Sequence, residues 1–452
     1  MSATPGPTAA PGRTATTAPD PLALVRTRGY AVLLVMAALL GIPISAVAFG
    51  FLALVSELQS LTYTDLPRGL GFHGTPSWWP IPLLAVTGLL VALSIRYLPG
   101  EGGHKPAEGL AAKGAPSSAE LPGIAIAALA SLAGGVVLGP EAPLIALGGG
   151  LAVFAVRAVK RDIQPNAIAV LAAAGSFAAI STLLGSPLLG AFLLMEAAGL
   201  GGVMMGVVLV PGLLAAGVGA LIFTGLGSWT GLGTYSLTLH HVPHADRPDI
   251  VAFGWALAVG VAAALTGAGV RRAALFLQTR VERQRIVATV LSGALVGVIA
   301  LVYAEWTGNK ASGVLYSGQS ALGPLLAGQA KQTAGALVVL VICKALAYSL
   351  SLSSFRGGPV FPSMFVGAAG GLAVAHLPGL DTTSGFAMGL GAMCVAMLKL
   401  PMTAVLLATL LLGAEGLTVM PLVIVAVVVS YVLSLRLTPV PGPAQDRAGS
   451  TP

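Results

Sequence analysis

Apolar runs long enough to cross a lipid bilayer recur along almost the whole chain. The first, from about residue 29 to 58, exceeds the roughly 20 residues that a membrane-spanning helix needs. Hydrophobic residue types make up 56% of the 452 residues, and charged types only 9%. A soluble domain of this length could not bury so much apolar surface, so the sequence predicts an all-α polytopic membrane protein.

The predicted spans fall into two halves of similar length, and several are shorter than a full crossing. In the first half we expect spans at about 29–58, 77–97, 122–138, 141–160, 166–184, 187–200 and 203–226. In the second half we expect them at about 250–276, 286–306, 333–352, 359–376, 384–398, 400–414 and 417–436, with a broken piece near 312–328. We therefore predict a first membrane repeat at 21–228, a linker at 229–249 and a second repeat at 250–437.

Basic residues cluster near the N-terminus at Arg26 and Arg28, at 157–161 and at 271–285. The positive-inside rule places such clusters on the cytoplasmic side. We therefore predict a protein of a bacterial-type plasma (inner) membrane with both termini cytoplasmic and the linker extracytoplasmic. The ends of the chain are expected to form a disordered cytoplasmic tail at 1–20, rich in Pro, Thr and Ala, and a short cytoplasmic tail at 438–452.

One carboxylate, Glu141, stands between two prolines in the apolar stretch LGPEAPLIALGGG, residues 138–150. An ionisable side chain in a membrane segment costs roughly 2.5 kcal/mol or more, so it marks a functional site by default. Proline lacks the amide hydrogen that a first helical turn leaves unsatisfied, so these prolines predict a helix start. Free amides and the helix dipole at such a start favour a negative charge, which either Glu141 or a small bound anion would supply.

The same helix start appears a second time. The sequences GPEAPLIALG from Gly139 and GPVFPSMFVG from Gly358 both fit G-P-x-x-P-x-x-x-x-G, and further helix starts follow at Pro187 and Pro401. Repeats with interrupted hydrophobic segments indicate a transporter whose site lies at the repeat interface near mid-membrane. The alternative is that Gly-Pro pairs only mark loops between spans.

Three ionisable residues lie within or beside the spans, and two of them, Glu196 and Lys344, have two interpretations each. Glu196, near the end of an apolar span, could relay a proton or could be a solvated or hydrogen-bonded helix-end carboxylate. Lys344 and Arg356 precede the second motif, where a cation near an anion path would raise local anion occupancy. Lys344 could equally snorkel or pair with a backbone carbonyl.

The remaining polar segments carry weaker signals. Gly102 and Gly103 could expose amides to an ion path or lie in an ordinary surface loop. His240, His241 and His244 could bind a metal together with Asp246, but they do not complete an ordered zinc spacing, so we predict an exposed polar loop and no metal site.

The motifs resemble those of the CLC chloride channels and proton-coupled chloride transporters, over nearly the whole membrane region. GPEAP at 139–143 is similar to the family's G-[KR]-E-G-P segment, whose glutamate is the external gate, and this implies a gating role for Glu141. GGPVFP at 357–362 is similar to G-x-F-x-P, whose amides bind chloride, and GEGGHKP at 100–106 occupies the place of G-S-G-I-P. The resemblance implies an anion site formed by Gly102, Gly103, Gly139, Pro140, Gly358, Val360 and Phe361.

The chain departs from the family's anion-binding pattern at several positions. Pro140 stands where the family has a basic residue before the gate. The first motif has no serine, because Gly102, Gly103 or His104 takes its place, so only backbone amides are available there. Val360 stands where the second motif has its aromatic residue.

The proton-pathway pattern differs as well. The family's internal proton glutamate would fall at Ala197, adjacent to Glu196, so proton delivery could use Glu196, water or neither. Tyr431 lies in the last span, but the family's central tyrosine has no secure counterpart.

The resemblance implies two inverted-topology repeats of tilted, partly broken helices, a homodimer with one ion path per subunit, and chloride transport. We expect proton-coupled exchange, in which deprotonated Glu141 occupies the anion site and protonation releases it, because one site cannot hold two negative charges cheaply. The alternatives are a passive voltage- or pH-gated chloride channel, a fluoride-selective transporter, and a membrane-embedded enzyme with Glu141 as general base. We predict no enzymatic activity, no cofactor and no nucleic-acid partner, and as partners chloride, protons and the lipid bilayer.

Overall fold

The structure is a computed structural model that describes residues 25–110, 114–159, 163–199, 202–239, 241–328 and 332–438. The predicted tail at 1–20, His240 and nearly all of the tail at 438–452 lie outside these residues. Within them the chain is almost entirely helical, and eight helices are long and apolar enough to cross a membrane. The all-α membrane fold predicted from the apolar runs is therefore confirmed.

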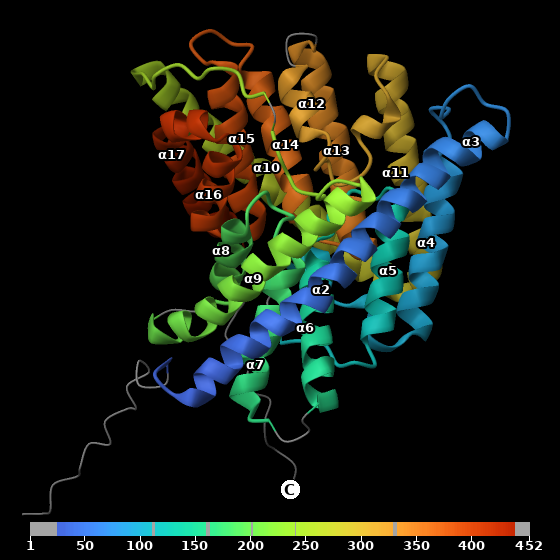
Figure 1. The fold of residues 1–452 in the computed structure, drawn as a ribbon. Coiled ribbons are helices and arrows are strands. Elements are labelled where there is room, and N and C mark those ends of the chain that lie inside the picture. Colours follow the sequence, from blue (N-terminus) through green and yellow to red (C-terminus); the bar gives the residue numbers. More distant parts are fainter. Residues whose placement is uncertain are drawn as a thin grey trace, which may run out of the picture.

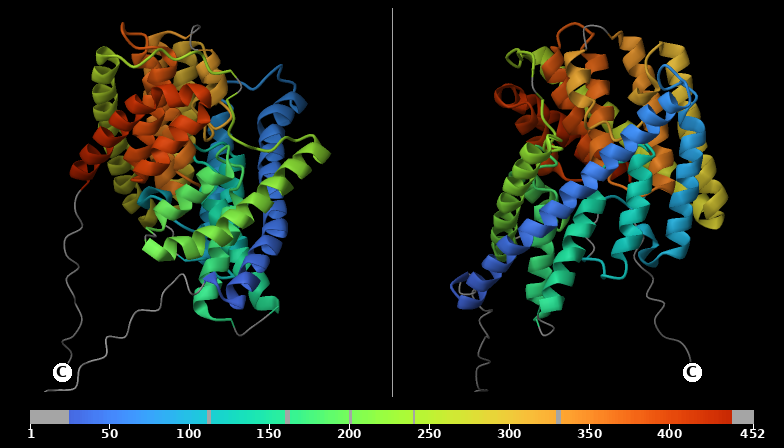
Figure 2. Two further views of the ribbon diagram at one scale, coloured as in Figure 1. Left: turned by 60° about the vertical axis from the view of Figure 1, so that its left-hand side comes forward. Right: turned by 45° about the vertical axis from the view of Figure 1, so that its right-hand side comes forward.

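The first half of the chain begins with a tilted 33-residue helix, α2, which crosses the molecule obliquely (Figures 1 and 2). The helical elements of the first half are α2 (Arg28–Ser60), the π-helical η1 (Leu61–Asp65), α3 (Leu66–Gly69), α4 (Pro80–Tyr97), the 3₁₀ turns η2 (Pro99–Gly102) and η3 (Pro106–Glu108), α5 (Leu121–Ala133), α6 (Glu141–Val159), α7 (Pro165–Ala179), α8 (Pro187–Ala197) and α9 (Gly202–Thr230).

The second half begins with another long helix, α10, which has 34 residues. The helical elements of the second half are α10 (Ile250–Arg283), α11 (Arg285–Thr307), the 3₁₀ turn η4 (Ala311–Gly313), α12 (Leu322–Ala327), α13 (Ala334–Ser354), α14 (Val360–Val374), α15 (Thr382–Leu398), α16 (Pro401–Leu411) and α17 (Ala414–Leu437). The piece predicted to be broken near 312–328 is indeed divided, between η4 and α12.

Two predicted spans are wrong at their C-terminal ends. The helix expected over 122–138 ends at Ala133, because Gly135 adopts a φ of 86°, a left-handed conformation that favours glycine and ends the helix. The helix expected over 166–184 ends at Ala179, and the following residues form turns up to Gly185, whose φ is 89°. Both unwound segments lead into the next helix start.

The helices of the two halves pack in corresponding pairs. α6 packs on α7 as α14 packs on α15, and α2 packs on α9 as α10 packs on α17. Figure 1 shows α6 and α7 at one end of the molecule and α14 and α15 at the other, as inverted repeats require. Glycines allow the close approach: a Cβ added at Gly148 or Gly371 would overlap the facing carbonyl of Gly175 or Gly385.

Candidate functional site

The two predicted helix starts meet at the interface between the repeats. α6 begins at Glu141 and α14 at Val360, and the residues just before them pair across the interface. The amide of Gly139 donates to the carbonyl of Gly358 at 2.8 Å, and the amide of Gly358 donates back to Gly139 at 2.6 Å. This bridge holds the positive ends of two helix dipoles close together inside the protein.

The Glu141 carboxylate occupies the N-terminus of the opposite helix. Its side chain is fully buried, and Oε1 accepts a hydrogen bond from the Val360 amide at 2.5 Å. Oε2 is buried and has no hydrogen-bond partner among the described residues. An unpaired buried oxygen costs about 1–3 kcal/mol, so this arrangement satisfies the carboxylate only in part.

Gly139 and Gly358 provide the space that the carboxylate fills. A Cβ added at Gly139 would overlap Glu141 Oε2, and one added at Gly358 would overlap Cδ and Oε1. The sequence predicts that both glycines contribute to anion binding, yet the amide of each donates to the carbonyl of the other across the bridge. We call the space bounded by Gly139, Gly358 and the Val360 amide the helix-tip site.

The other residues predicted for this site have different surroundings. The Phe361 ring lies against Gly139, where an added Cβ would come within 2.9 Å of ring atom Cδ2. Pro140 has no amide hydrogen and lines a cavity outside the helix-tip site. Sequence reasoning overlooked Tyr348 of α13, whose buried hydroxyl donates to the Pro359 carbonyl at 2.7 Å. The sequence signal that points to Tyr348 is its hydroxyl, a polar group in the apolar span just before the second motif.

A cavity of about 690 Å³, the outer cavity, reaches the helix-tip region from one face of the molecule. It is bounded by Leu138 and Pro140 on the inside and by the end of α2, residues of 235–239 with His241, and the segment 316–327. Its polar groups are mostly uncharged hydroxyls and amides from Ser56, Gln59, Thr238, Ser317, Gln319 and Ser320. A hydrated ion could therefore approach Glu141 without passing a fixed charge in this lining.

Gly102 and Gly103 lie in a tight glycine turn with φ values of 72° and 89°. The Gly103 amide donates to the Gly100 carbonyl at 2.8 Å, so it is not free to bind an anion as the sequence suggested. Gly102 is buried against the side chain of Arg356.

The structure also places Glu196 and Lys344. Glu196 accepts hydrogen bonds from the Met402 and Thr403 amides at 2.9 and 2.7 Å, and from the Thr403 hydroxyl at 2.6 Å. It thus caps the N-terminus of α16, as a hydrogen-bonded helix-end carboxylate would.

Lys344 Nζ donates to the four carbonyls of 313–316 at 2.9–3.3 Å and lies 4.4 Å from the centre of the Phe365 ring. Lys344 therefore pairs with backbone carbonyls, which is one of the two interpretations that its sequence position allowed.

Comparison with known proteins gives matches over most of the chain. A family described as "Voltage gated chloride channel" matches residues 87–435. The "Putative ion-transport protein YfeO" of Escherichia coli O139:H28 (strain E24377A / ETEC) is 30% identical over 356 residues, which cover 78% of this chain and 81% of the relative. The protein of the same name from Shigella boydii serotype 4 (strain Sb227) matches to the same extent.

Solved structures share the fold at low sequence identity. A slow cyanobacterial Cl⁻/H⁺ antiporter superposes with a TM-score of 0.70 at 19% identity, covering 90% of this chain and 94% of the other. A CLC-type fluoride/proton antiporter gives 0.64 at 17% identity, with coverage of 90% and 96%. A eukaryotic CLC transporter gives 0.67 at 15%, with coverage of 90% and 72%.

Proposed function

We propose, from the premise that the chain belongs to the voltage-gated chloride channel family, that it exchanges protons for chloride with Glu141 as the gate. Membership of this family makes the protein an integral membrane protein of CLC-type anion transport. The observation that carries the finer proposal is the Glu141 carboxylate on the Val360 amide, because a negative group of this protein occupies a site suited to a small anion.

Competition for the helix-tip site would couple the two ions. Ionised Glu141 and chloride both need the Val360 amide and the positive helix ends, and placing two negative charges there is unfavourable. Protonation removes one charge, and Oε2 can take the proton without losing a hydrogen bond, since it has no partner among the described residues. Neutral Glu141 then leaves the site and chloride enters, so protons and chloride exchange in opposite directions.

The outer cavity would supply the route for the released side chain and for chloride. It reaches Pro140, the residue next to Glu141, and its hydroxyl and amide lining can solvate an anion and pass protons through water. Arg280, Arg283 and Arg285 gather where α10 ends and α11 begins, on the face that the positive-inside rule assigns to the cytoplasm. We propose on this basis that the outer cavity opens away from the cytoplasm, in a bacterial-type inner membrane.

The test is a flux measurement in liposomes that carry the purified protein. A chloride gradient is imposed, and external pH and chloride are followed for the wild type and Glu141→Gln. We expect the wild type to move protons uphill, and Glu141→Gln to retain chloride flux without proton movement. Glu305→Gln is the matched control, because this exposed carboxylate accepts from the Ser77 hydroxyl near the end of α11, and it should behave as the wild type.

The outcomes separate the candidates. Chloride flux without proton movement in the wild type would indicate a passive channel. Absence of chloride flux in the wild type would contradict both chloride exchange and a chloride channel.

A further inference from the structure

Lys344 of α13 places an ammonium group in the interior of the second repeat. Its side chain is fully buried, and no carboxylate lies within 4.0 Å of it among the described residues. The ammonium donates instead to four consecutive backbone carbonyls, those of 313–316, at 3.3, 3.2, 2.9 and 3.3 Å. The Phe365 ring of α14 adds a cation–π contact. We call these four carbonyls and the Phe365 ring the carbonyl cradle.

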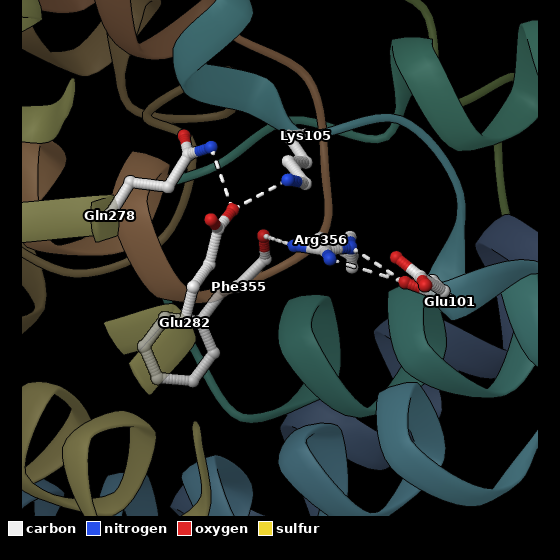
Figure 3. Close-up of polar contacts among 6 residues, drawn as sticks. All are labelled: Glu101, Lys105, Gln278, Glu282, Phe355 and Arg356. Atoms are coloured by element: carbon white, nitrogen blue, oxygen red, sulfur yellow. Dashed lines mark hydrogen bonds and ion pairs between the residues drawn. The ribbon is translucent and has the colours of Figure 1, made fainter. Parts of the chain in front are cut away.

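A second buried cation, Arg356, has different surroundings. Its guanidinium donates to the carbonyls of Glu101 and Phe355 at 3.1–3.2 Å, and the ion pair of Lys105 with Glu282 lies beside it (Figure 3). Lys344 has no such ion pair next to it in the part of the chain that the structure describes, so the carbonyl cradle alone stabilises its charge.

The chemistry of the carbonyl cradle is that of a monovalent cation site. Carbonyl oxygens and aromatic faces bind monovalent cations in proteins, and nitrogen–oxygen distances of 2.9–3.3 Å suit an ammonium ion. The cradle offers four acceptors and no donor, whereas an ammonium offers three donors and no acceptor. A neutral amine would direct its lone pair at one of the oxygens. The cradle is therefore complementary to a primary ammonium ion, which the chain supplies on its own side chain.

The segment 313–316 connects the carbonyl cradle to the outer cavity. Tyr316 lines that cavity, and its amide donates to the Gly135 carbonyl at 3.0 Å, in the unwound segment that leads to Glu141. The Tyr316 φ of 60° is a left-handed conformation, which is unfavourable for a residue with a side chain and persists only where the surroundings fix it. Here the Tyr316 carbonyl is held by Lys344 and its amide by Gly135.

The helices that form the carbonyl cradle also form the helix-tip site. Phe365 lies five residues after Val360 in α14. Tyr348 lies one helical turn after Lys344 in α13, and its hydroxyl donates to the Pro359 carbonyl. The ammonium thus joins α13, α14 and the wall of the outer cavity at one point.

We propose that Lys344 is a positioning residue for chloride transport: its ammonium fills the carbonyl cradle as a tethered monovalent cation and so fixes Tyr316 in the wall of the outer cavity. Lys344 is not among the residues that line the cavity, so it acts through Tyr316 and not by contact with the anion. This inference rests on the proposed function, which assigns the outer cavity to chloride.

Chemical rescue tests the carbonyl cradle directly. Lys344→Ala deletes the atoms that n-propylammonium would replace, namely three carbons and the ammonium. We expect n-propylammonium sulfate to raise the thermal unfolding temperature of Lys344→Ala in detergent, because binding to the folded state alone stabilises it. The neutral n-propanol, of similar shape, should not. Lys310→Ala is the matched control: this exposed lysine precedes the same segment, and its variant should not respond to n-propylammonium.

Chloride flux in liposomes gives the functional result. Lys344→Ala should need severalfold more external chloride for half-maximal flux, with a smaller change in the maximal rate, because the entry route is altered while Glu141 is unchanged. Buffered n-propylammonium sulfate on both sides of the membrane should restore most of this loss, and n-propanol should not.

Two further variants keep the proposal testable if Lys344→Ala does not fold. Lys344→Met retains most of the side-chain volume but has no donor, so it should show the same loss in flux and no rescue. Tyr316→Gly removes the unfavourable backbone conformation, since glycine adopts a positive φ readily. Lys344→Met should therefore lower the thermal unfolding temperature less in the Tyr316→Gly background than in wild type.

Three results would overturn the proposal. They are wild-type chloride dependence in Lys344→Met, equal responses of Lys344→Ala to n-propylammonium and n-propanol, and a loss of stability from Lys344→Met that is as large with Tyr316→Gly as without it. Failure of the proposed function would appear separately, as absent chloride flux in wild type, whereas ammonium binding by Lys344→Ala is measured without transport.

Discussion

At the scale of single residues, the helix-tip site depends on two missing side chains as much as on Glu141. The three heavy atoms nearest to a Cβ added at Gly358 all belong to Glu141: Cγ, Cδ and Oε1. Neither Gly139 nor Gly358 has a positive φ, so each is required here for space and not for backbone conformation. The site therefore contains a direct, testable coupling between a glycine and a carboxylate 217 positions apart in the chain.

Gly358→Ala should displace the Glu141 carboxylate and lower stability. Overpacking of a buried site typically costs about 1–3 kcal/mol, and the variant should show a lower thermal unfolding temperature in detergent. The double variant Gly358→Ala/Glu141→Ala should regain most of this loss, because the clashing atoms are gone and the two changes are not additive.

Gly139→Ala provides the comparison. A Cβ there would also come within 2.9 Å of the Phe361 ring, so Glu141→Ala should rescue it less completely. The described packing would be contradicted if Glu141→Ala restored the thermal stability of both glycine variants equally. It would also be contradicted if Glu141→Ala restored none of the stability lost in Gly358→Ala.

At the scale of elements, short helices that end inside the protein need partners for their free amides. α16 has 11 residues, and two of its first amides donate to Glu196 at the end of α8. Three donors converge on this carboxylate: the Met402 and Thr403 amides and the Thr403 hydroxyl. Glu196 thus joins the corresponding helices α8 and α16 of the two repeats.

Glu196→Gln should lower the free energy of unfolding by about 0.5–2 kcal/mol, because it removes a charged cap from the α16 N-terminus. Thermal unfolding in detergent measures the change, with Glu305→Gln as the surface control. We expect proton-coupled flux to persist in Glu196→Gln. Loss of proton movement with unchanged stability and chloride flux would instead assign Glu196 the proton-relay role.

At the scale of the whole molecule, gating by a buried carboxylate predicts how transport depends on pH. Lower external pH increases the neutral fraction of Glu141, which empties the helix-tip site, so wild-type chloride flux should rise as pH falls. Glu141→Gln is permanently neutral and should show little dependence over the same range. Liposome flux at a series of external pH values measures both, and a wild-type profile as flat as that of Glu141→Gln would argue against gating by this group.

The predicted homodimer is also a property of the whole molecule. The helices α8, α9, α16 and α17 present exposed apolar residues, with Leu188, Leu221, Met402 and Leu417 among them. We expect light scattering of the detergent-solubilised protein, corrected for bound detergent, to give twice the mass of one chain. A mass of one chain at all protein concentrations would contradict this expectation.

The sequence by itself determined the class of the protein, its two halves and the places where its critical helices start. Apolar runs and Gly-Pro pairs act within one helical span or turn, so their consequences can be inferred locally, as at Glu141 and Val360. The helix ends at Ala133 and Ala179 were missed because the residues that follow them are as apolar as the helices themselves.

Only the tertiary structure decided which partners these local elements find. It placed Glu141 on the amide of Val360, joined Gly139 to Gly358, surrounded Lys344 with carbonyls and set Arg356 against the carbonyls of Glu101 and Phe355. Each arrangement depends on the packing of helices far apart in the chain. Local sequence preferences fix how a helix begins, whereas the distance between two helix ends is fixed by the sum of many side-chain contacts over the whole interface.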